Sequence, residues 1–467
     1  METNLTIHFF GAASTVTGSK YLIELLDQKL LIDCGLFQGL KELRQLNWQN
    51  LPFDVSELDS VILTHGHLDH VGYLPLLVKQ GFRGKIHATA PTIDIARLIL
   101  LDSAKIQEED TEKANRSGYS KHNPAKPLYT TGEAEAVFPL FQVETIDNWI
   151  KLSELFTFRF RYNGHIVGAT FIELKAADKL LVFSGDIGRQ NDPLLYAPNK
   201  PEKADILFIE STYGARLHPG NPEIRLAEVI REAAAKNGPI IVPVFAVERA
   251  QLLMFYLWKL RSEHRIPDLP IYIDSPMGQG VWQVFSKHRP WHKLSASEAK
   301  QMRRVIRVIN KQQETFRLAQ NKQPKIILAA SGMATGGRVL TYFEQYLGQA
   351  SATILMVGYQ GEGTRGRALL DGAKEIRIHG KFHEVRATCV LVEGLSAHAD
   401  QNELIGWVSD LDKKPEKIFI VHGEPESSAA LKAKLTEVYG YDSIIPQLDS
   451  CYRIPVHLSR DERAPTH

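Results

Sequence analysis

The sequence predicts an α/β protein in which a domain with a parallel sheet interrupts a strand-rich domain. Up to about residue 90, and again over 156–186, short apolar runs end in Gly, Asp or His, which is typical of strands and tight turns. From about residue 203, apolar runs alternate with helical segments, which predicts a parallel, doubly wound sheet. Strands are expected again over 386–422, so the first domain should resume there.

The first domain is predicted to span residues 1–202 and 386–467. Its expected strands are apolar runs between turn residues, at 5–11, 21–25, 29–35, 60–65, 156–163, 170–176 and 179–186. Residues 91–120 repeat apolar side chains at three- and four-residue spacing, which predicts a long helix, and a late helix is expected at 425–438. Helices outside a strand-rich layer indicate an α/β arrangement.

The second domain is predicted to span residues 203–385. Its expected strands are buried apolar runs, at 204–212, 239–245, 270–276, 325–332 and 352–359. Helical segments follow most of them, at 222–237, 248–261, after 276, and at 338–347. This alternation predicts that the strands are parallel, because each helix returns the chain to the same edge of the sheet.

Composition excludes several classes of protein. The chain has 467 residues, 44% of them hydrophobic and 23% charged, which is typical of a soluble protein with two or three domains. No apolar run is long enough to cross a bilayer, the N-terminus lacks the pattern of a signal peptide, and the three cysteines are far apart, so we expect a cytoplasmic protein with no membrane partner. Because the net charge is only +1, a polyanionic substrate would require positive charge, including metal, concentrated in one cleft.

The strongest functional signal is a run of metal-ligand residues that follows the apolar segment 61–64. It reads His65-Gly66-His67-Leu68-Asp69-His70. Imidazole and carboxylate without thiolate suit zinc and related divalent ions. Four candidate ligands in six residues cannot easily surround one ion, so we expect them to be shared between two adjacent ions.

Further candidate ligands stand at the ends of other predicted strands. His165 lies between glycines that permit close approach of the backbone, and His422 follows the apolar run 418–421. Asp186 ends an apolar strand, where a carboxylate is unfavourable unless it is paired or bound to metal. Asp33, in a similar position, is predicted to orient a ligand histidine.

These motifs resemble a known superfamily. HGHLDH, Gly164-His165, SGD at 184–186 and VHGE at 421–424 are similar to the metallo-β-lactamase superfamily. IESTYG (209–214), VPVFAVERAQ (242–251), SGMATGGR (331–338), GYQGEGTRGR (358–367) and GLSAHAD (394–400) resemble its β-CASP branch of nucleic-acid-processing nucleases, which includes the endonuclease subunit of the pre-mRNA 3′-end cleavage machinery. The resemblance runs from about residue 5 to 455.

The resemblance implies a four-layer αββα domain into which a β-CASP domain is inserted as a lid. It implies two Zn²⁺ ions, one held by His65, His67 and His165, the other by Asp69, His70 and His422, with Asp186 bridging both. A hydroxide activated by the two ions would attack phosphorus, positioned by Asp186. Glu210 and His398 would lie beside the scissile phosphate, with His398 as the general acid for the departing 3′ oxygen.

Two glycine-rich segments are predicted to contact substrate phosphates. These predicted contacts are Ser331, Gly332, Thr335, Gly336, Arg338, Arg365 and Arg367. Backbone N–H groups at a helix start form an anion site, although a simple strand-to-helix turn fits the spacing of SGMATGGR equally well. Neither segment is a Walker A or Rossmann motif, so no nucleotide cofactor is expected.

The leading hypothesis is a zinc-dependent ribonuclease that acts on single-stranded RNA as an endonuclease, a 5′-exonuclease or both. The alternatives are a hydrolase of small esters or thioesters, a nuclease directed at DNA, and a catalytically silent RNA-binding subunit. The first alternative has no use for the inserted domain, and the last conflicts with the complete set of ligands. The sequence does not set the oligomeric state, for which a homodimer is a hypothesis.

Overall fold

The computed structural model describes residues 2–117, 124–358 and 360–458. It divides into two compact units: the first contains Met1–Leu217 and His398–His467, and the second contains His218–Ala397. The borders predicted from the sequence, 202/203 and 385/386, lie earlier. They differ because β11 (Ile206–Glu210) pairs with strands of the first unit, and β19 (Thr388–Leu391) pairs with a strand of the second.

The first unit contains two β-sheets that pack face to face. One has the order β21-β1-β2-β3-β4-β5-β6, with β1 Glu2–Phe9, β2 Tyr21–Leu25, β3 Gln28–Ile32, β4 Ser60–Ile62, β5 Lys85–Thr89, β6 Phe141–Glu144 and β21 Cys451–His457. The other has the order β20-β11-β10-β9-β8-β7, with β7 Ile150–Lys151, β8 Phe156–Tyr162, β9 Thr170–Ala176, β10 Lys179–Phe183 and β20 Lys417–Val421. Alternate side chains of β8 face the opposite sheet, so Phe156, Phe158 and Phe160 are buried in the shared core.

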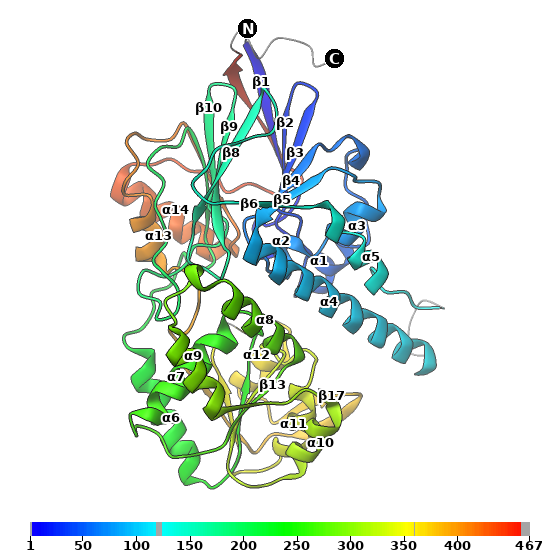
Figure 1. Cartoon of the computed structure of the whole chain (residues 1–467), viewed down its shortest axis with the longest axis vertical. Helices are drawn as coiled ribbons and strands as arrows, with labels where there is room; N and C mark the ends of the chain where they lie inside the picture. Colours follow the sequence, from blue (N-terminus) through cyan, green and yellow to red (C-terminus); the bar gives the residue numbers. More distant parts are fainter. Residues whose placement is uncertain (1, 118–123, 359, 459–467) are drawn as a thin grey trace. The chain divides into compact units, whose positions relative to one another are not determined.

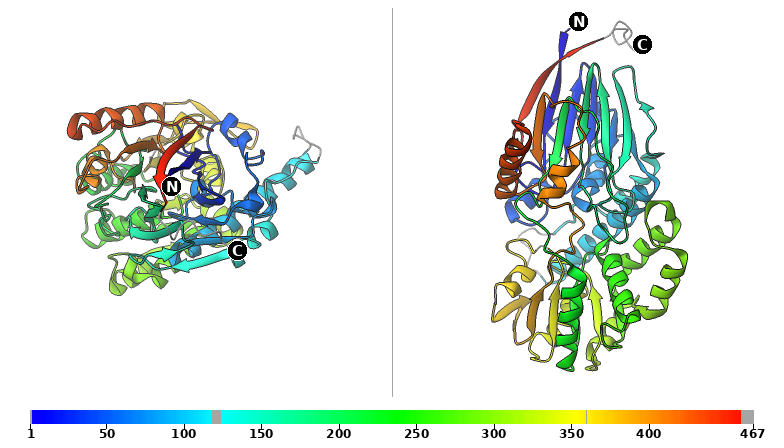
Figure 2. Two further views of the ribbon diagram at one scale, coloured as in Figure 1. Left: turned by 90° about the horizontal axis from the view of Figure 1, so that it is seen from above. Right: turned by 90° about the vertical axis from the view of Figure 1, so that its left-hand side faces the viewer.

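Helices cover the outer faces of these two sheets, which makes four layers (Figures 1 and 2). On the side of β4–β6 lie α1 Lys41–Leu46, α2 Leu68–Val71, α3 Leu74–Lys79, α4 Ala90–Ser117 and α5 Thr131–Glu135. On the other side, α13 (Gln401–Trp407) and α14 (Pro425–Tyr439) bury Trp407 and Leu431 against the second sheet. The predicted αββα architecture is therefore confirmed.

The second unit is built on a sheet whose six strands are all parallel. The order is β14-β13-β15-β12-β16-β19, with β12 Ile240–Pro243, β13 Ile271–Asp274, β14 Ile306–Val308, β15 Ile326–Ala329 and β16 Thr353–Met356. The helices are α6 Pro222–Ala235, α7 Arg249–Ser262, α8 Pro276–Lys287, α9 Ala296–Val305, α10 Gln312–Gln320, α11 Val339–Tyr346 and α12 Arg365–Leu370. A hairpin of β17 (Glu375–Ile378) and β18 (Lys381–Glu384) completes the unit. The predicted parallel sheet is confirmed.

Two local expectations differ from the structure. The sequence predicts strands over 386–422, but this stretch also includes α13, which begins at a capping box between Asp400 and Glu403. The predicted helix at 91–120 runs as α4 to Ser117, and residues 118–120 lie outside the described part of the chain. Within the described ranges, no helix is both long and apolar enough to span a bilayer.

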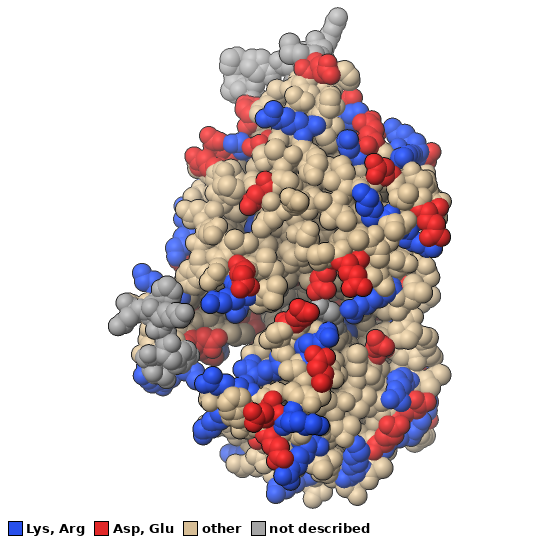
Figure 3. Space-filling model, turned by 180° about the vertical axis from the view of Figure 1, so that it is seen from behind, with Lys and Arg blue, Asp and Glu red and all other residues tan. Residues whose placement is uncertain are grey.

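The surface carries both signs of charge. In the view of Figure 3, lysine and arginine side chains are interspersed with aspartate and glutamate, and neither sign covers this face alone. This mixture agrees with the net charge of +1. Binding of a polyanion therefore needs a local source of positive charge.

Candidate metal centre

The ligand-rich turn connects β4 to the short helix α2. β4 ends at Ile62, and α2 begins at Leu68. His65 and His67 therefore lie in the turn between them, and Asp69 and His70 follow at once in α2. Gly66 is required at its position, because a Cβ there would lie 2.7 Å from the side chain of Ile95 on α4. The turn therefore packs directly against the long helix.

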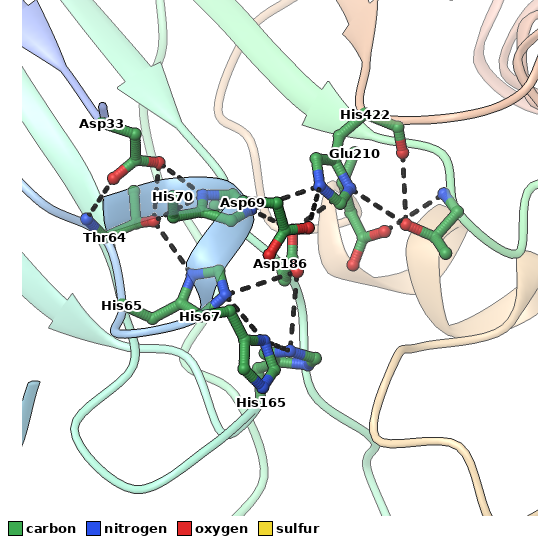
Figure 4. Close-up of polar contacts among 12 residues, drawn as sticks. Asp33, Thr64, His65, His67, Asp69, His70, His165, Asp186, Glu210 and His422 are labelled. Carbon is green, nitrogen blue, oxygen red and sulfur yellow. Dashed lines mark hydrogen bonds and ion pairs between the residues drawn. The ribbon is translucent and has the colours of Figure 1, made fainter. Parts of the chain in front are cut away.

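Three histidines and one carboxylate form a first cluster (Figure 4). His67 Nδ1 lies 3.1 Å from His65 Nε2 and 3.2 Å from His165 Nε2. Asp186 Oδ2 lies 3.4 Å from His65 Nε2 and 3.5 Å from His165 Nε2. All four donor atoms therefore converge on one small volume.

A second cluster contains Asp69, His70 and His422. His422 Nε2 lies 3.2 Å from His70 Nε2 and 3.5 Å from Asp69 Oδ2. The other oxygen of Asp186, Oδ1, lies 3.4 Å from His70 Nε2 and 3.3 Å from His422 Nδ1. Asp186 thus presents one carboxylate oxygen to each cluster.

These contacts fit bound divalent cations better than a network of hydrogen bonds. His67 Nδ1 faces two other ring nitrogens, and Asp186 Oδ1 is buried without a hydrogen-bond donor. Burial lowers the pKa of His65 and His165 well below the ordinary value, and lowers the pKa of His67 to about 4. Neutral imidazoles with free lone pairs, next to carboxylates, are the donors that such cations prefer.

His70 is oriented by a buried carboxylate and a hydroxyl. Asp33 Oδ2 accepts from His70 Nδ1 at 2.7 Å, and both Asp33 oxygens accept from Thr64, from its N–H at 2.7 Å and its hydroxyl at 2.8 Å. Burial opposes protonation of His70, but Asp186 and Asp33 outweigh it and hold the pKa well above the ordinary value. Because Nδ1–H donates to Asp33, Nε2 faces the second cluster, where a bound cation would displace the proton that the raised pKa places on it.

Two threonines contact ligand histidines and were missed by the sequence reasoning. The Thr64 hydroxyl lies 3.1 Å from His65 Nδ1, and Thr212 Oγ1 lies 3.1 Å from His422 Nδ1. Thr64 directly precedes HGHLDH, and Thr212 belongs to IESTYG, so their positions next to motifs were a usable signal. Each hydroxyl helps to fix the orientation of one ring.

Glu210 and His398 lie beside the clusters. Glu210 Oε1 lies 3.2 Å from His398 Nδ1 and also accepts from Ile187 N–H at 2.6 Å. Burial opposes protonation of His398, but Glu210 outweighs it and raises the pKa of the imidazole. Glu210 also lies near enough to Asp186 and His422 to form a third group of possible ligands. Its bond to His398 favours a role in orienting that ring, which lies 4.0 Å from Asp186 through Nε2.

The residues predicted to bind phosphate lie in the second unit, where they contact one another or other residues of that unit. Ser331, Gly332, Thr335 and Gly336 form the turn between β15 and α11. Ser331 Oγ accepts from the N–H groups of Thr335 and Gly336 at 3.2 and 3.4 Å, so these N–H groups point into the turn. The anion site at this turn stays a prediction.

The three arginines predicted to bind phosphate have partners within the second unit. Arg338 pairs with the fully buried carboxylate of Asp274 and donates to backbone carbonyls. Arg365 donates to the carbonyls of residues 334, 335 and 377, and Arg367 pairs with Asp371 at 2.9 Å. Their contact with substrate also stays a prediction, and Tyr359 of the GYQGEGTRGR motif lies outside the described residues.

Comparisons with known proteins identify the family. The description "Metallo-beta-lactamase superfamily" matches residues 16–243, "Beta-Casp domain" matches 250–369, and "Zn-dependent metallo-hydrolase RNA specificity domain" matches 383–446. Ribonuclease TTHA0252 of Thermus thermophilus is 33% identical over 442 residues, which cover 93% of this chain and 96% of the relative. The chain belongs to the β-CASP branch of the metallo-β-lactamase superfamily. The predicted resemblance is confirmed, and the fold and family identify a metal-dependent hydrolase.

Further relatives and one solved structure align over most of the chain. An RNase J-like protein of Methanocaldococcus jannaschii is 29% identical, with 94% of this chain and 97% of the relative covered. The transcription termination factor FttA of Methanosarcina mazei is 28% identical, with 91% and 68% covered. The crystal structure of a protein of unknown function from Enterococcus faecalis aligns with a TM-score of 0.53 at 15% identity, over 97% of this chain and 100% of that one. This last likeness shows a shared fold.

Proposed function

We propose that this protein is a zinc-dependent ribonuclease that hydrolyses phosphodiester bonds of single-stranded RNA. The observation that carries the proposal is the pair of ligand clusters that share Asp186, next to the Glu210–His398 pair. RNA as substrate is supported by the match to an RNA specificity domain and by relatives named as a ribonuclease and as RNase J-like.

Each cluster would hold one Zn²⁺ ion. His65, His67 and His165 would hold one ion, Asp69, His70 and His422 would hold the other, and Asp186 would contribute an oxygen to each. Two such cations, when bound, supply Lewis-acid stabilisation of the attacking and leaving oxygens and lower the pKa of bound water. The protein fixes the orientation of the ligand rings through hydrogen bonds at Nδ1. Asp33 binds Nδ1 of His70, and Thr64 and Thr212 contact Nδ1 of His65 and of His422.

His398 would supply the proton for the departing 3′ oxygen. Its Nδ1 faces Glu210, whose carboxylate favours the protonated ring, and its Nε2 points toward Asp186 at 4.0 Å. A proton held at Nε2 therefore lies next to the clusters, where the leaving oxygen of a bound strand would be. Products would carry a 5′-phosphate and a 3′-hydroxyl.

The alternatives make different demands on the chain. A hydrolase of small esters or thioesters would need only the first unit, whereas this chain has a complete parallel-sheet unit and a match to an RNA specificity domain. DNA remains an alternative substrate, because the same clusters would activate water for either backbone. We place the activity in the cytoplasm without a nucleotide cofactor, and a homodimer remains the hypothesis for the oligomeric state.

The test is cleavage of 5′-labelled and internally labelled single-stranded RNA and of the matching DNA, by the wild-type protein and by a His67→Ala/Asp69→Ala variant. The expected result is RNA cleavage by the wild type and none by the variant, and the label pattern separates endonucleolytic from 5′-exonucleolytic action. Intact RNA in the presence of protein that contains zinc would refute the proposal, and preferential cleavage of DNA would replace the substrate.

A further inference from the structure

A buried lysine joins two loops of the first unit that hold metal-ligand residues. Lys20 is 2% exposed, and its Nζ donates to the carbonyls of Gly18 at 2.9 Å and Gly35 at 2.6 Å. The ammonium also lies over the rings of Phe37 and Tyr73, at 4.5 and 5.2 Å from their centroids. No carboxylate among the described residues forms an ion pair with it. A fully buried lysine without such a pair is rare. The two hydrogen bonds from Lys20 to carbonyls link the loop at Gly18 to the loop at Gly35.

The first of the two loops, residues 10–19, holds the backbone at two ligands of the second cluster. Ser19 N–H donates to the carbonyl of Asp69 at 2.8 Å, and the carbonyl of Ala12 accepts from His422 N–H at 2.7 Å. Lys20 binds this loop at Gly18, one residue before the contact with Asp69. The position of the loop therefore affects ligands that are 353 residues apart in the sequence, Asp69 and His422.

The second loop, residues 33–36, holds the third ligand of the same cluster. Cys34 N–H donates to the carbonyl of His70 at 2.7 Å, and Gly35 N–H donates to the carbonyl of Ser19 at 3.0 Å. A Cβ at Gly35 would lie 1.6 Å from the carbonyl oxygen of Asp69, so this loop packs directly on the ligand turn. Lys20 binds it at Gly35 and so ties it to the first loop.

In the described part of the chain, the first cluster receives no backbone hydrogen bond of this kind, and its one link to these loops is the Asp33 side chain, which accepts from Thr64 beside His65. Among the described contacts, neither loop forms a backbone hydrogen bond with His65, His67 or His165. Resting on the two-ion centre of the proposed function, we propose that Lys20 is a positioning residue for the second cluster alone. By joining the two loops, it sets the backbone at Asp69, His70 and His422.

The titratable side chains that lie against Lys20 are neutral near pH 7, so its ammonium is the one charged group among them. Burial raises the pKa of the Cys34 thiol and of the Tyr73 phenol to about 12, so both are neutral near pH 7. Burial lowers the pKa of Lys20 to about 8, so the ammonium is retained at that pH. Asp33 is the next carboxylate along the second loop, and Asp449 lines the same small pocket as Lys20 from an exposed turn.

The test is the release of zinc from the full-length protein into a chromogenic chelator, with a second buried lysine as the control. Lys20→Met removes the ammonium and keeps a side chain of similar length. Lys325→Met is the matched control, because Lys325 is also 2% exposed, donates to two backbone carbonyls and has a pKa lowered to about 8 by burial, but lies in the second unit. Lys20→Gln, which keeps one donor group, serves if the methionine variant does not fold.

We expect the wild type and Lys325→Met to release two ions per chain slowly. Lys20→Met should keep one ion at the wild-type rate and release the other roughly 10–100-fold faster, because losing a residue that orients a ligand typically weakens metal affinity by about that factor. Two ions released at the wild-type rate, or both released faster to the same degree, would overturn the inference and leave the proposed function standing. Wild-type protein that binds no zinc would overturn both.

Discussion

Replacing Asp33 by asparagine should weaken zinc binding without disturbing the backbone. Asp33 has a φ of +58°, a conformation that asparagine also tolerates. Its carboxylate accepts three hydrogen bonds of 2.7–2.8 Å, two from Thr64 and one from His70 Nδ1. An amide has only one acceptor oxygen, so at least one of these bonds is lost.

The expected magnitude follows from which bond is lost. If the amide oxygen keeps Thr64 N–H, the amide NH₂ faces His70 Nδ1, and the ring proton must move to Nε2. Nε2 faces His422 and Asp186, so the proton would occupy the nitrogen that we propose as the metal ligand. Loss of such a carboxylate partner typically weakens metal binding by about 10–100-fold, equivalent to about 1.4–2.8 kcal/mol.

The assay is a competition titration of zinc against a chelator of known affinity, for the wild type and Asp33→Asn. Asp205→Asn is the control, because Asp205 also accepts a backbone N–H, from Leu180 at 2.8 Å, but at the opposite end of β11 from Glu210. One of the two ions should bind at least tenfold more weakly in Asp33→Asn and normally in the control. Wild-type affinity for both ions in Asp33→Asn would refute the reasoning.

Three further predictions follow from the same geometry. His398→Ala should lower the single-turnover rate constant of RNA cleavage by about 10²–10⁴-fold with zinc content unchanged. A rate constant equal to that of the wild type would exclude His398 as the proton donor. Because the pKa of Lys20 is about 8 folded and 10.5 in the unfolded chain, the unfolded state binds the proton more tightly above pH 8. Its contribution to the free energy of unfolding should therefore rise by about 1.5 kcal/mol from pH 8 to 9.5 in denaturant titrations, and Lys20→Met should lack this rise; equal slopes would contradict the lowered pKa. Arg338→Met should destabilise the second unit by about 3–5 kcal/mol, because the buried carboxylate of Asp274 loses its charged partner; unchanged thermal unfolding would leave the arginine available for substrate.

Local sequence patterns were sufficient to predict most of the fold. Apolar runs that lead into Asp or His became strands at β3, directly before Asp33, and at β20, directly before His422. The position of the border between the two units was not predictable from the sequence. The apolar run ILFIE at 206–210 would suit a strand of the first unit and the first strand of the second unit equally well. Only the pairing of β11 with β10 and β20 decides this.

The convergence of the candidate ligands could be predicted, because a buried histidine or carboxylate is unfavourable unless it has a partner. A histidine or carboxylate at the end of a buried strand needs a partner, and the structure brings His165, Asp186 and His422 to the HGHLDH turn. Residues that act through ordinary hydrogen bonds gave no such signal. Lys20 resembles any lysine before a strand, and the partner of Arg338 lies 64 residues away, so both roles depend on tertiary contacts.

The central claim is tested most directly by titrating metal-free protein with zinc and measuring the initial rate of single-stranded RNA cleavage at each step. If both clusters must be filled, the rate should stay near zero up to about one equivalent per chain and rise to its plateau by about two. Activity that reaches its plateau at one equivalent, or that persists in the metal-free protein, would contradict a two-ion centre built around Asp186.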